Sequence, residues 1–331
     1  MAVITIQKKE IWDRFVDESP HGLIFHKWEF LKIVEKYSGY NFLPYGVVRG
    51  EALIGLFPLF HKRIGFFSRV FSPPPRSGLP YLGFLMGPEY ETAKQDRKET
   101  YLSQVIDQIN DEIKLLSPNY ISIYSTPGFL DIRPFIWNNY TTDPKFNYVI
   151  NLNPDLNSIR NGFKLNLRKQ MSLSEKQNLS LVPDTNLSSF YDLMTQRYKE
   201  QGLNFSFYNI DYLKALFKMY PENLKLYSLY QNNNLIGGIL TQEYKKFLTW
   251  HGNAKIIEGV YGNEYILWQL IQKAKGDGYS KFELTGANLR NLCQFKSKFN
   301  PSLEICYNAS RKDSLGKFAE WIYMNLVRKR H

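Results

Sequence analysis

Cysteine is scarce in this chain of 331 residues, which contains only Cys293 and Cys306. Two cysteines cannot build a disulfide framework, so a disulfide-rich secreted domain is excluded and a reduced, cytoplasmic compartment is expected. Long apolar runs are also missing. No stretch of about 18 or more residues is both uncharged and mainly apolar, so no membrane-spanning helix is expected. The short apolar start at residues 1–6 precedes its lysines, unlike a signal peptide.

The motifs of several common catalytic classes are absent as well. The five histidines show no metal-ligand spacing and there is no CxxC, so no metal site is expected. Without GxxxxGK[ST], a GxGxxG after a strand, or GxSxG, nucleotide hydrolysis, dinucleotide redox chemistry and the serine-hydrolase elbow are disfavoured. No sequence feature activates Cys293, so a buried, inert thiol is the preferred interpretation. Transfer chemistry remains, in which positioning and oxyanion stabilisation supply most of the rate.

Basic residues are abundant. Lys and Arg number 42 against 31 Asp and Glu, which gives a formal charge of 42 − 31 = +11. A polyanionic partner is therefore favoured, namely RNA, an anionic membrane face or a nucleotide-linked substrate. The alternative is general basicity for solubility. A length of 331 residues with 44 % hydrophobic residues indicates two globular domains at about 150 residues each.

A weak internal repeat organises the chain. Residues 45–55 and 227–237 both read as strand, turn and strand. At one fixed offset, Tyr45, Leu53, Ile54 and Gly55 coincide with Tyr227, Leu235, Ile236 and Gly237, and the turn residues Gly50 and Asn232 coincide too. Each hairpin follows a helical pattern (28–37; 190–199 and 212–220). Each is followed by a further helix (101–116; 264–275) and a strand (120–124; 281–284). This order predicts a duplicated α+β architecture.

Residues 151–155 read as a boundary followed by a helix start, with Asp155 or Asn157 as the cap. The helix expected over 160–176 is basic, and Arg160, Lys164 and Arg168 recur every four residues on one face, with Lys169 beside them. One interpretation is a face that contacts phosphates. The other is an ordinary solvated helix face, and the sequence leaves both open.

The segment from Thr249 to Phe299 carries the most specific pattern. Its pieces are Trp250 and Gly252 in a turn, a helix ending at Ala274 and Gly278, Glu283 and Gly286 after a strand, and Phe295-Lys296 followed by Phe299. In this order they resemble the FemABX family of aminoacyl-tRNA-dependent peptidyltransferases, and equally its broader GNAT-like, CelD-type acyltransferase relatives. Residues 25–32, 160–176 and 193–197 also resemble family helices.

The resemblance implies an α+β fold of two tandem GNAT-like domains, with mixed β-sheets flanked by helices. The first domain would cover residues 1–150 and be completed by about 302–331. The second, residues 151–301, would carry the transfer site. Apart from the donor substrate, aminoacyl-tRNA or acyl-CoA, no tightly bound cofactor is implied.

The resemblance also implies roles for individual residues. Lys296 matches a lysine proposed to stabilise the oxyanion or the tRNA-linked ester, and Phe295 matches the aromatic beside it. Lys32 matches a lysine that contacts a substrate diphosphate, and Arg197 an arginine of the acceptor site. The remaining substrate-binding positions that it suggests are Trp28, Trp250, His251, Tyr261 and Asn263.

Two departures from the family keep alternatives open. The aromatic run at residues 204–208 replaces a second arginine, which favours an acceptor other than a UDP-linked muramyl peptide. The RxxGxG/A pyrophosphate loop of acetyl-CoA enzymes is missing, and residues 260–263 stand near its expected place. An aminoacyl-tRNA donor is therefore preferred over acyl-CoA, and the acceptor is expected to be an amine on an envelope precursor or a polysaccharide.

A non-catalytic module that binds RNA or a membrane surface is the other hypothesis. The basic end at 328–331, after an expected apolar helix over 318–327, suits peripheral contact with the inner face of the membrane. DNA is not an expected partner, and a monomer or weak dimer is expected.

Overall fold

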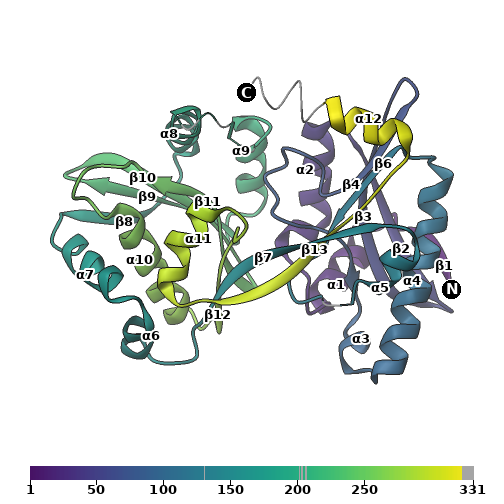
Figure 1. Cartoon of the computed structure of the whole chain (residues 1–331), viewed down its shortest axis with the longest axis horizontal. Helices are drawn as coiled ribbons and strands as arrows, with labels where there is room; N and C mark the ends of the chain where they lie inside the picture. Colours follow the sequence, from purple (N-terminus) through teal and green to yellow (C-terminus); the bar gives the residue numbers. More distant parts are fainter. Residues whose placement is uncertain (130, 201, 203, 206, 323–331) are drawn as a thin grey trace. The chain divides into compact units, whose positions relative to one another are not determined.

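The computed structural model describes residues 1–129, 131–200, 202, 204–205 and 207–322 (Figure 1). The chain divides into two compact units. Unit 1 is Met1–Lys145 together with the chain from Ile305 onward, and unit 2 is Phe146–Glu304. The chain passes from one unit to the other within β7 (Thr141–Asn151) and within β13 (Ser302–Lys312). From the sequence, these boundaries are expected at 150/151 and 301/302.

Unit 1 is a mixed sheet with helices. Its remaining elements are β1 (Ala2–Thr5), α1 (Lys9–Glu18), α2 (Trp28–Ser38), β2 (Asn41–Arg49), β3 (Ala52–Ile64), β4 (Phe67–Ser72), β5 (Leu85–Met86), α3 (Pro88–Thr92), α4 (Gln95–Leu115), β6 (Tyr120–Tyr124), α5 (Arg133–Trp137) and α12 (Ser314–Ile322). The strand order is β1-β2-β3-β4-β6-β13, with β5 beside β3. Only β4 and β6 pair in parallel; the other neighbours are antiparallel.

Unit 2 repeats this plan. Its elements besides β7 are α6 (Leu156–Gly162), α7 (Leu165–Ser174), β8 (Leu179–Asp184), α8 (Leu187–Glu200), α9 (Ile210–Met219), β9 (Leu224–Gln231), β10 (Asn234–Tyr244), β11 (Lys246–Ala254), α10 (Gly262–Gly276), β12 (Lys281–Leu284) and α11 (Arg290–Lys296). The strand order is β8-β9-β10-β11-β12-β7, and only β11 and β12 are parallel. The order of directions therefore matches unit 1 strand for strand, and the duplicated α+β architecture expected from the sequence is confirmed.

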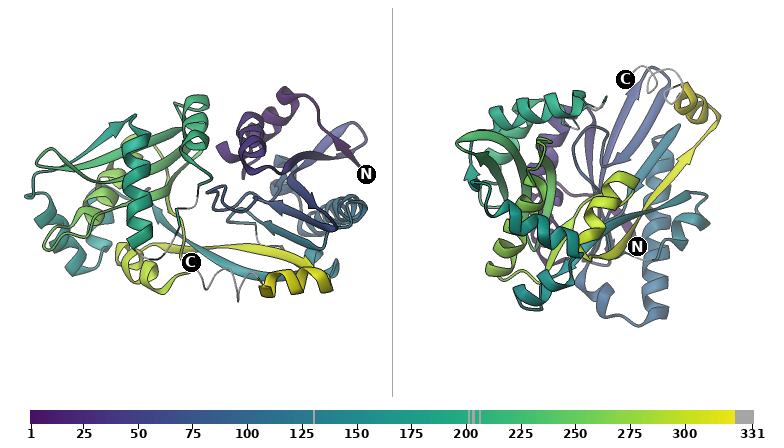
Figure 2. Two further views of the ribbon diagram at one scale, coloured as in Figure 1. Left: turned by 90° about the horizontal axis from the view of Figure 1, so that it is seen from above. Right: turned by 60° about the vertical axis from the view of Figure 1, so that its left-hand side comes forward.

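Both faces of the sheet in unit 2 are covered by helices, as the alternating side chains of β10 show. Ile239 belongs to the buried cluster that α7 and α10 complete, whereas a Cβ on its neighbour Gly238 would meet Phe190 of α8. Helices α7 and α10 therefore cover one face, and α8 and α9 the other, as Figures 1 and 2 show from three sides. The central strand β10 is buried without interruption over residues 236–242, so side chains are covered on both sides of the sheet there.

The two hairpin turns form as their residues predict. Gly50 in the β2–β3 turn has φ +61°, and Asn232 in the β9–β10 turn has φ +47°. Glycine and asparagine are the residues that adopt this left-handed conformation with the least strain. The repeat recognised in the sequence is therefore a repeat of turn chemistry as well as of hydrophobic pattern.

The single basic helix expected over 160–176 is wrong. Asp155 does cap α6, where its carboxylate accepts a hydrogen bond from the Ser158 backbone N–H at 3.0 Å, but this helix ends at Gly162. Phe163 is extended (φ −72°, ψ 152°) and buried, because its ring packs against Trp268 and Phe299. A new helix, α7, then begins. Residues spaced four apart on the two sides of this break therefore do not share one helix face.

Candidate active site

The parallel strands β11 and β12 of unit 2 part at one end. Their register runs from Phe247–Phe282 to Thr249–Leu284, after which β12 stops and β11 continues to Ala254. Thr285 holds the point of separation, since its hydroxyl donates to the Thr249 carbonyl at 2.8 Å. Where two parallel strands separate, backbone groups on both strands become free of each other. Ligands commonly bind at such strand ends in open α/β sheets.

Lys296 closes this point from α11. Its ammonium donates to the carbonyl oxygen of Thr285 and, at 3.4 Å, to that of Gly286. Burial lowers the pKa of Lys296 to about 8, and the neighbouring Cys293 opposes this shift. The lysine is a partly buried cation fixed by two carbonyls, which is how a preorganised charge for a developing oxyanion is held.

Gly286 allows this arrangement because it has φ +79°, a conformation that side chains rarely adopt. A Cβ there would lie 3.9 Å from Nζ of Lys296. The Gly286 N–H donates to the side-chain oxygen of Asn147 at 3.0 Å, and Asn147 Nδ2 donates to the buried carboxylate of Glu283 at 3.0 Å. A hydrogen-bonded chain thus runs from β12 through β7 to the loop that holds the lysine.

Cys293 lies one helical turn before Lys296 and is partly exposed, so the expectation of a buried thiol is wrong for this residue. The buried cysteine is Cys306. Burial raises the pKa of Tyr148, and a hydrogen bond with Cys293 adds to the rise. Phe295, beside Lys296, packs on Phe299 with ring centroids 5.7 Å apart, so it anchors α11 to the core.

Trp250 and His251 form an aromatic group at the same end of β11. The ring of Phe207 lies 5.1 Å from Trp250 and 4.9 Å from His251, and Phe205 lies 6.0 Å from His251. These phenylalanines belong to the aromatic run at 204–208, of which Ser206 lies outside the described residues. Thr285 Oγ1 also approaches the Trp250 carbonyl at 3.5 Å. The structure therefore brings Trp250 and His251 to the separation point that Lys296 closes.

Tyr261 and Asn263 lie at the start of α10, and their contacts fix this helix to the strands. The Asn263 side-chain oxygen accepts from the Ala254 N–H at 2.8 Å, and the Tyr261 N–H donates to the Gln177 side chain at 3.2 Å. The side-chain oxygen of Asn263 thus holds the end of β11. The substrate-binding roles predicted for Tyr261 and Asn263 from the sequence stay predictions.

Arg197 projects from α8 with only 11 % of its side chain exposed. Its Nη1 donates to Glu200 at 3.0 Å, and its buried Nε has no hydrogen-bond partner among the described residues. The next residue, Tyr198, lies 5.1 Å from the ring of Phe205. Arg197 is therefore adjacent in sequence to a residue, Tyr198, that contacts the aromatic group containing Phe205 and His251.

Lys32 and Trp28 belong to α2 of unit 1. Lys32 is 45 % exposed and pairs with Glu35 at 2.5 Å. Trp28 makes edge contacts with Trp12 at 5.9 Å and Phe42 at 5.7 Å, so it packs within unit 1. Their predicted substrate contacts stay predictions.

The four cations assigned to phosphates have different surroundings. Arg160 is engaged within unit 2, since it pairs with Glu175 at 3.3 Å and stacks over Trp268 at 5.4 Å. Lys164 and Lys169 are exposed, and Arg168 is partly buried.

Further expectations concern metals and membranes. Among the residues that the structure describes, no cluster of histidine, cysteine and carboxylate side chains is suited to a metal ion. Within the same described ranges, no helix combines the length and apolarity needed to cross a membrane. The expected apolar helix over 318–327 begins in α12, which is described to Ile322; the rest of it and the basic end at 328–331 lie outside the described residues.

Several residues of this site carry no signal in the sequence. Thr285, Asn147 and Tyr148 lie in ordinary strand or loop patterns, and Asn147 meets Glu283 136 residues further along the chain. Only a sheet that pairs β7 with β12 brings them together.

Comparison with known proteins supports the fold. No protein-family model matches the sequence, and no curated protein matches it significantly. The crystal structure of FemX matches with a TM-score of 0.71 at 12 % identity, over 93 % of this chain and 97 % of that one. L-PGS from Bacillus licheniformis matches with a TM-score of 0.59 at 14 % identity, over 97 % and 96 %.

A tandem GNAT protein from the clavulanic acid biosynthesis pathway matches with a TM-score of 0.52 at 8 % identity, over 94 % of this chain and 97 % of that one. Each match spans nearly the whole length of both chains. The resemblance seen in the sequence is confirmed at the level of the fold: this chain has the tandem GNAT-like α+β fold of FemX and of the tandem GNAT protein.

Proposed function

We propose that this protein is an acyltransferase that forms an amide on an amine acceptor, with aminoacyl-tRNA as the preferred donor. The observation that carries the proposal is the Lys296 ammonium, held by the Thr285 and Gly286 carbonyls where β11 and β12 part. A fixed, partly desolvated cation is suited to the negative charge that develops when an amine adds to an ester carbonyl.

The proposed reaction needs no covalent enzyme intermediate. The neutral amine adds to the ester carbonyl of the donor, and its carbonyl oxygen takes up negative charge beside Lys296. The carbon–oxygen bond to the ribose then breaks as the amide forms, and the proton lost by the amine ends on the ribose oxygen. Positioning and oxyanion stabilisation supply the rate, which suits a site without an activated nucleophile.

Two features favour aminoacyl-tRNA as the donor. The net charge of +11 suits a polyanionic substrate, and the RxxGxG/A loop that acetyl-CoA enzymes use for pyrophosphate is missing near residues 260–263. The acceptor we propose is an amine on a cell-envelope precursor, and the protein would act in the cytoplasm.

Acyl-CoA is the second candidate donor, because the parted parallel strands and the match to a tandem GNAT protein fit a thioester substrate equally well. The same lysine would then face a thioester carbonyl, and the acceptor would be a polysaccharide or small-molecule amine.

A donor panel separates the candidates. The purified protein is titrated with aminoacyl-tRNA, acetyl-CoA and long-chain acyl-CoA, and thermal shift and filter binding are recorded across a salt series. For two to four phosphate contacts, tRNA binding should weaken roughly ten- to hundredfold between about 50 and 200 mM salt. A response to a CoA thioester alone would replace the tRNA donor. No turnover with any donor and a panel of amines would instead favour a non-catalytic binding module.

A further inference from the structure

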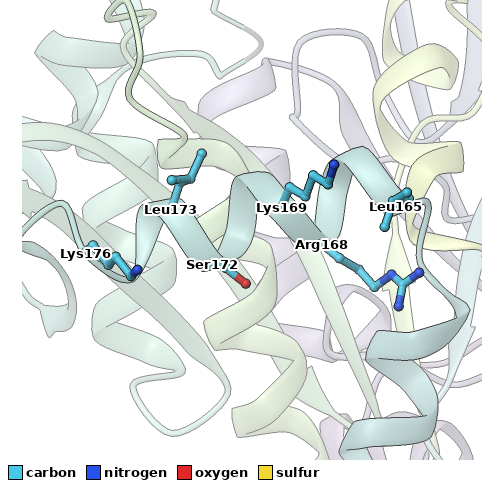
Figure 3. Close-up of a pocket in the computed structure, with 6 residues that line it drawn as sticks. All are labelled: Leu165, Arg168, Lys169, Ser172, Leu173 and Lys176. Carbon is cyan, nitrogen blue, oxygen red and sulfur yellow. The ribbon is translucent and has the colours of Figure 1, made fainter.

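Helix α7 of unit 2 presents an unusual outward face. Leu167, Met171 and Ser174 on its inner side are buried, and this side packs on α10. The outer side carries the residues drawn in Figure 3, all from α7 except Lys176 just beyond it: Leu165, Arg168, Lys169, Ser172, Leu173 and Lys176. They line a shallow, open hollow of about 410 Å³.

Two leucines on this face remain in solvent, with 58 % of Leu165 and 49 % of Leu173 exposed. They are eight residues apart, which separates them by about 12 Å along the helix axis and about 80° around it. Lys169 lies between them in angle, Arg168 lies on the other side of Leu165, and Lys176 follows just beyond the end of the helix. Apolar and cationic side chains are therefore interleaved on one surface instead of lying on opposite sides of the helix.

The charge of this face is of one sign. Within the described parts of the chain, no carboxylate pairs with Arg168, Lys169 or Lys176. The nearby Glu175 pairs with Arg160 at 3.3 Å. The Nε of Arg168 is buried without a hydrogen-bond partner among the same residues. A surface with unpaired cations is complementary to an anionic one.

The two exposed leucines distinguish between a nucleic acid and an anionic lipid surface as the partner of this face. A nucleic acid backbone is contacted by cations and polar groups, and two exposed leucines add nothing to such contacts. An anionic lipid surface uses both kinds of side chain, because cations meet the head groups while apolar side chains enter the acyl boundary. We propose that the outer face of α7 docks the protein onto an anionic membrane surface.

The proposal requires contributions from both charge and apolar insertion. Each cation near an anionic bilayer is worth roughly a fivefold change in partitioning, so removing three should reduce binding roughly a hundredfold. Replacing both leucines by serine leaves the charge unchanged and should still reduce binding by at least about tenfold.

Vesicle sedimentation of the full-length protein tests this. Phosphatidylcholine vesicles with and without phosphatidylglycerol are compared at about 0.1 M salt, where the Debye length is about 10 Å. Three variants are measured: L165S/L173S; R168Q/K169Q/K176Q; and the control K94Q/K214Q/K218Q, which loses the same charge from exposed lysines elsewhere. Thermal unfolding verifies that each variant is folded.

The expected result is that the parent binds only the phosphatidylglycerol vesicles, both α7 variants lose this binding, and the control keeps it. Three results would overturn the proposal. The parent does not sediment with either vesicle, or the leucine variant binds as the parent does, or the control loses as much as the α7 cation variant. Loss of tRNA retention in the cation variant with unchanged vesicle binding would assign the face to RNA instead.

Discussion

Replacing Lys296 by methionine removes a cation whose charged form is disfavoured by burial. In the folded protein the pKa of Lys296 is lowered from 10.5 to about 8. The folded state therefore releases this proton at lower pH than the unfolded chain does. Between these two pKa values the unfolded state binds more protons, so the lysine's contribution to stability rises with pH.

The magnitude follows from the pKa difference of 10.5 − 8 = 2.5. A difference of one in pKa is worth about 1.36 kcal/mol, so below pH 7 the buried charge costs about 3 kcal/mol relative to a lysine with an ordinary pKa. The cost falls as the pH passes through the folded pKa, and by pH 10 only about 1 kcal/mol remains. The parent should thus gain about 2 kcal/mol over Lys296→Met between pH 7 and pH 10. Contacts that methionine loses at every pH cancel in this difference.

Urea unfolding of both proteins at a series of pH values, analysed by linear extrapolation, measures the quantity. Lys298→Met is the matched control, because its ammonium lies over the Phe295 ring and not on the Thr285 and Gly286 carbonyls. A difference in unfolding free energy between the parent and Lys296→Met that stays constant with pH would contradict this prediction, because it would show that the ammonium is as well solvated as in the unfolded chain.

Three further predictions concern the same site. Gly252→Ala should destabilise the protein by about 3 kcal/mol or more in chemical unfolding. A Cβ there would lie 2.2 Å from the Gly238 backbone oxygen, and φ is +146°. A variant as stable as the parent would contradict the close approach. Asn147→Ala should lower the free energy of unfolding by about 1–3 kcal/mol, since both the buried Glu283 carboxylate and the Gly286 N–H lose their hydrogen bond to Asn147. A loss near zero would show that this network does not stabilise the fold. Transfer activity should fall as the pH rises through about 8, where Lys296 loses its proton; a rate that keeps rising past pH 9 in a full pH–rate profile would exclude a role for the ammonium.

Much of the fold is predictable from the sequence because the repeated hairpins carry their own turn chemistry. Gly50 and Asn232 fix the two turns, and the apolar patterns around them place the following helix and strand in each unit. The parallel pairing of β4 with β6 and of β11 with β12 has no local signal. It arises when the helix between the strands packs back on the sheet, which is a property of the whole unit.

The site is only partly predictable for the same reason. Lys296 stands in a recognisable run of residues, but the carbonyls that hold it belong to Thr285 and Gly286. The side-chain oxygen of Asn147, on another strand, accepts from the Gly286 N–H. The basic stretch shows the opposite error. A spacing of four residues predicts one helix face, yet the burial of Phe163 in the core outweighs the local preference and breaks the helix.

Single-turnover kinetics test whether Lys296 stabilises the transition state of acyl transfer. Lys296→Ala and Lys298→Ala are compared with the parent for transfer from the preferred donor to an amine, with donor binding measured in parallel. We predict that Lys296→Ala lowers the transfer rate about 10²–10³-fold, the usual effect of removing one oxyanion donor. Donor binding should change little, and Lys298→Ala should stay near the parent. Equal rates in the Lys296→Ala variant and the parent, with intact donor binding in both, would contradict it.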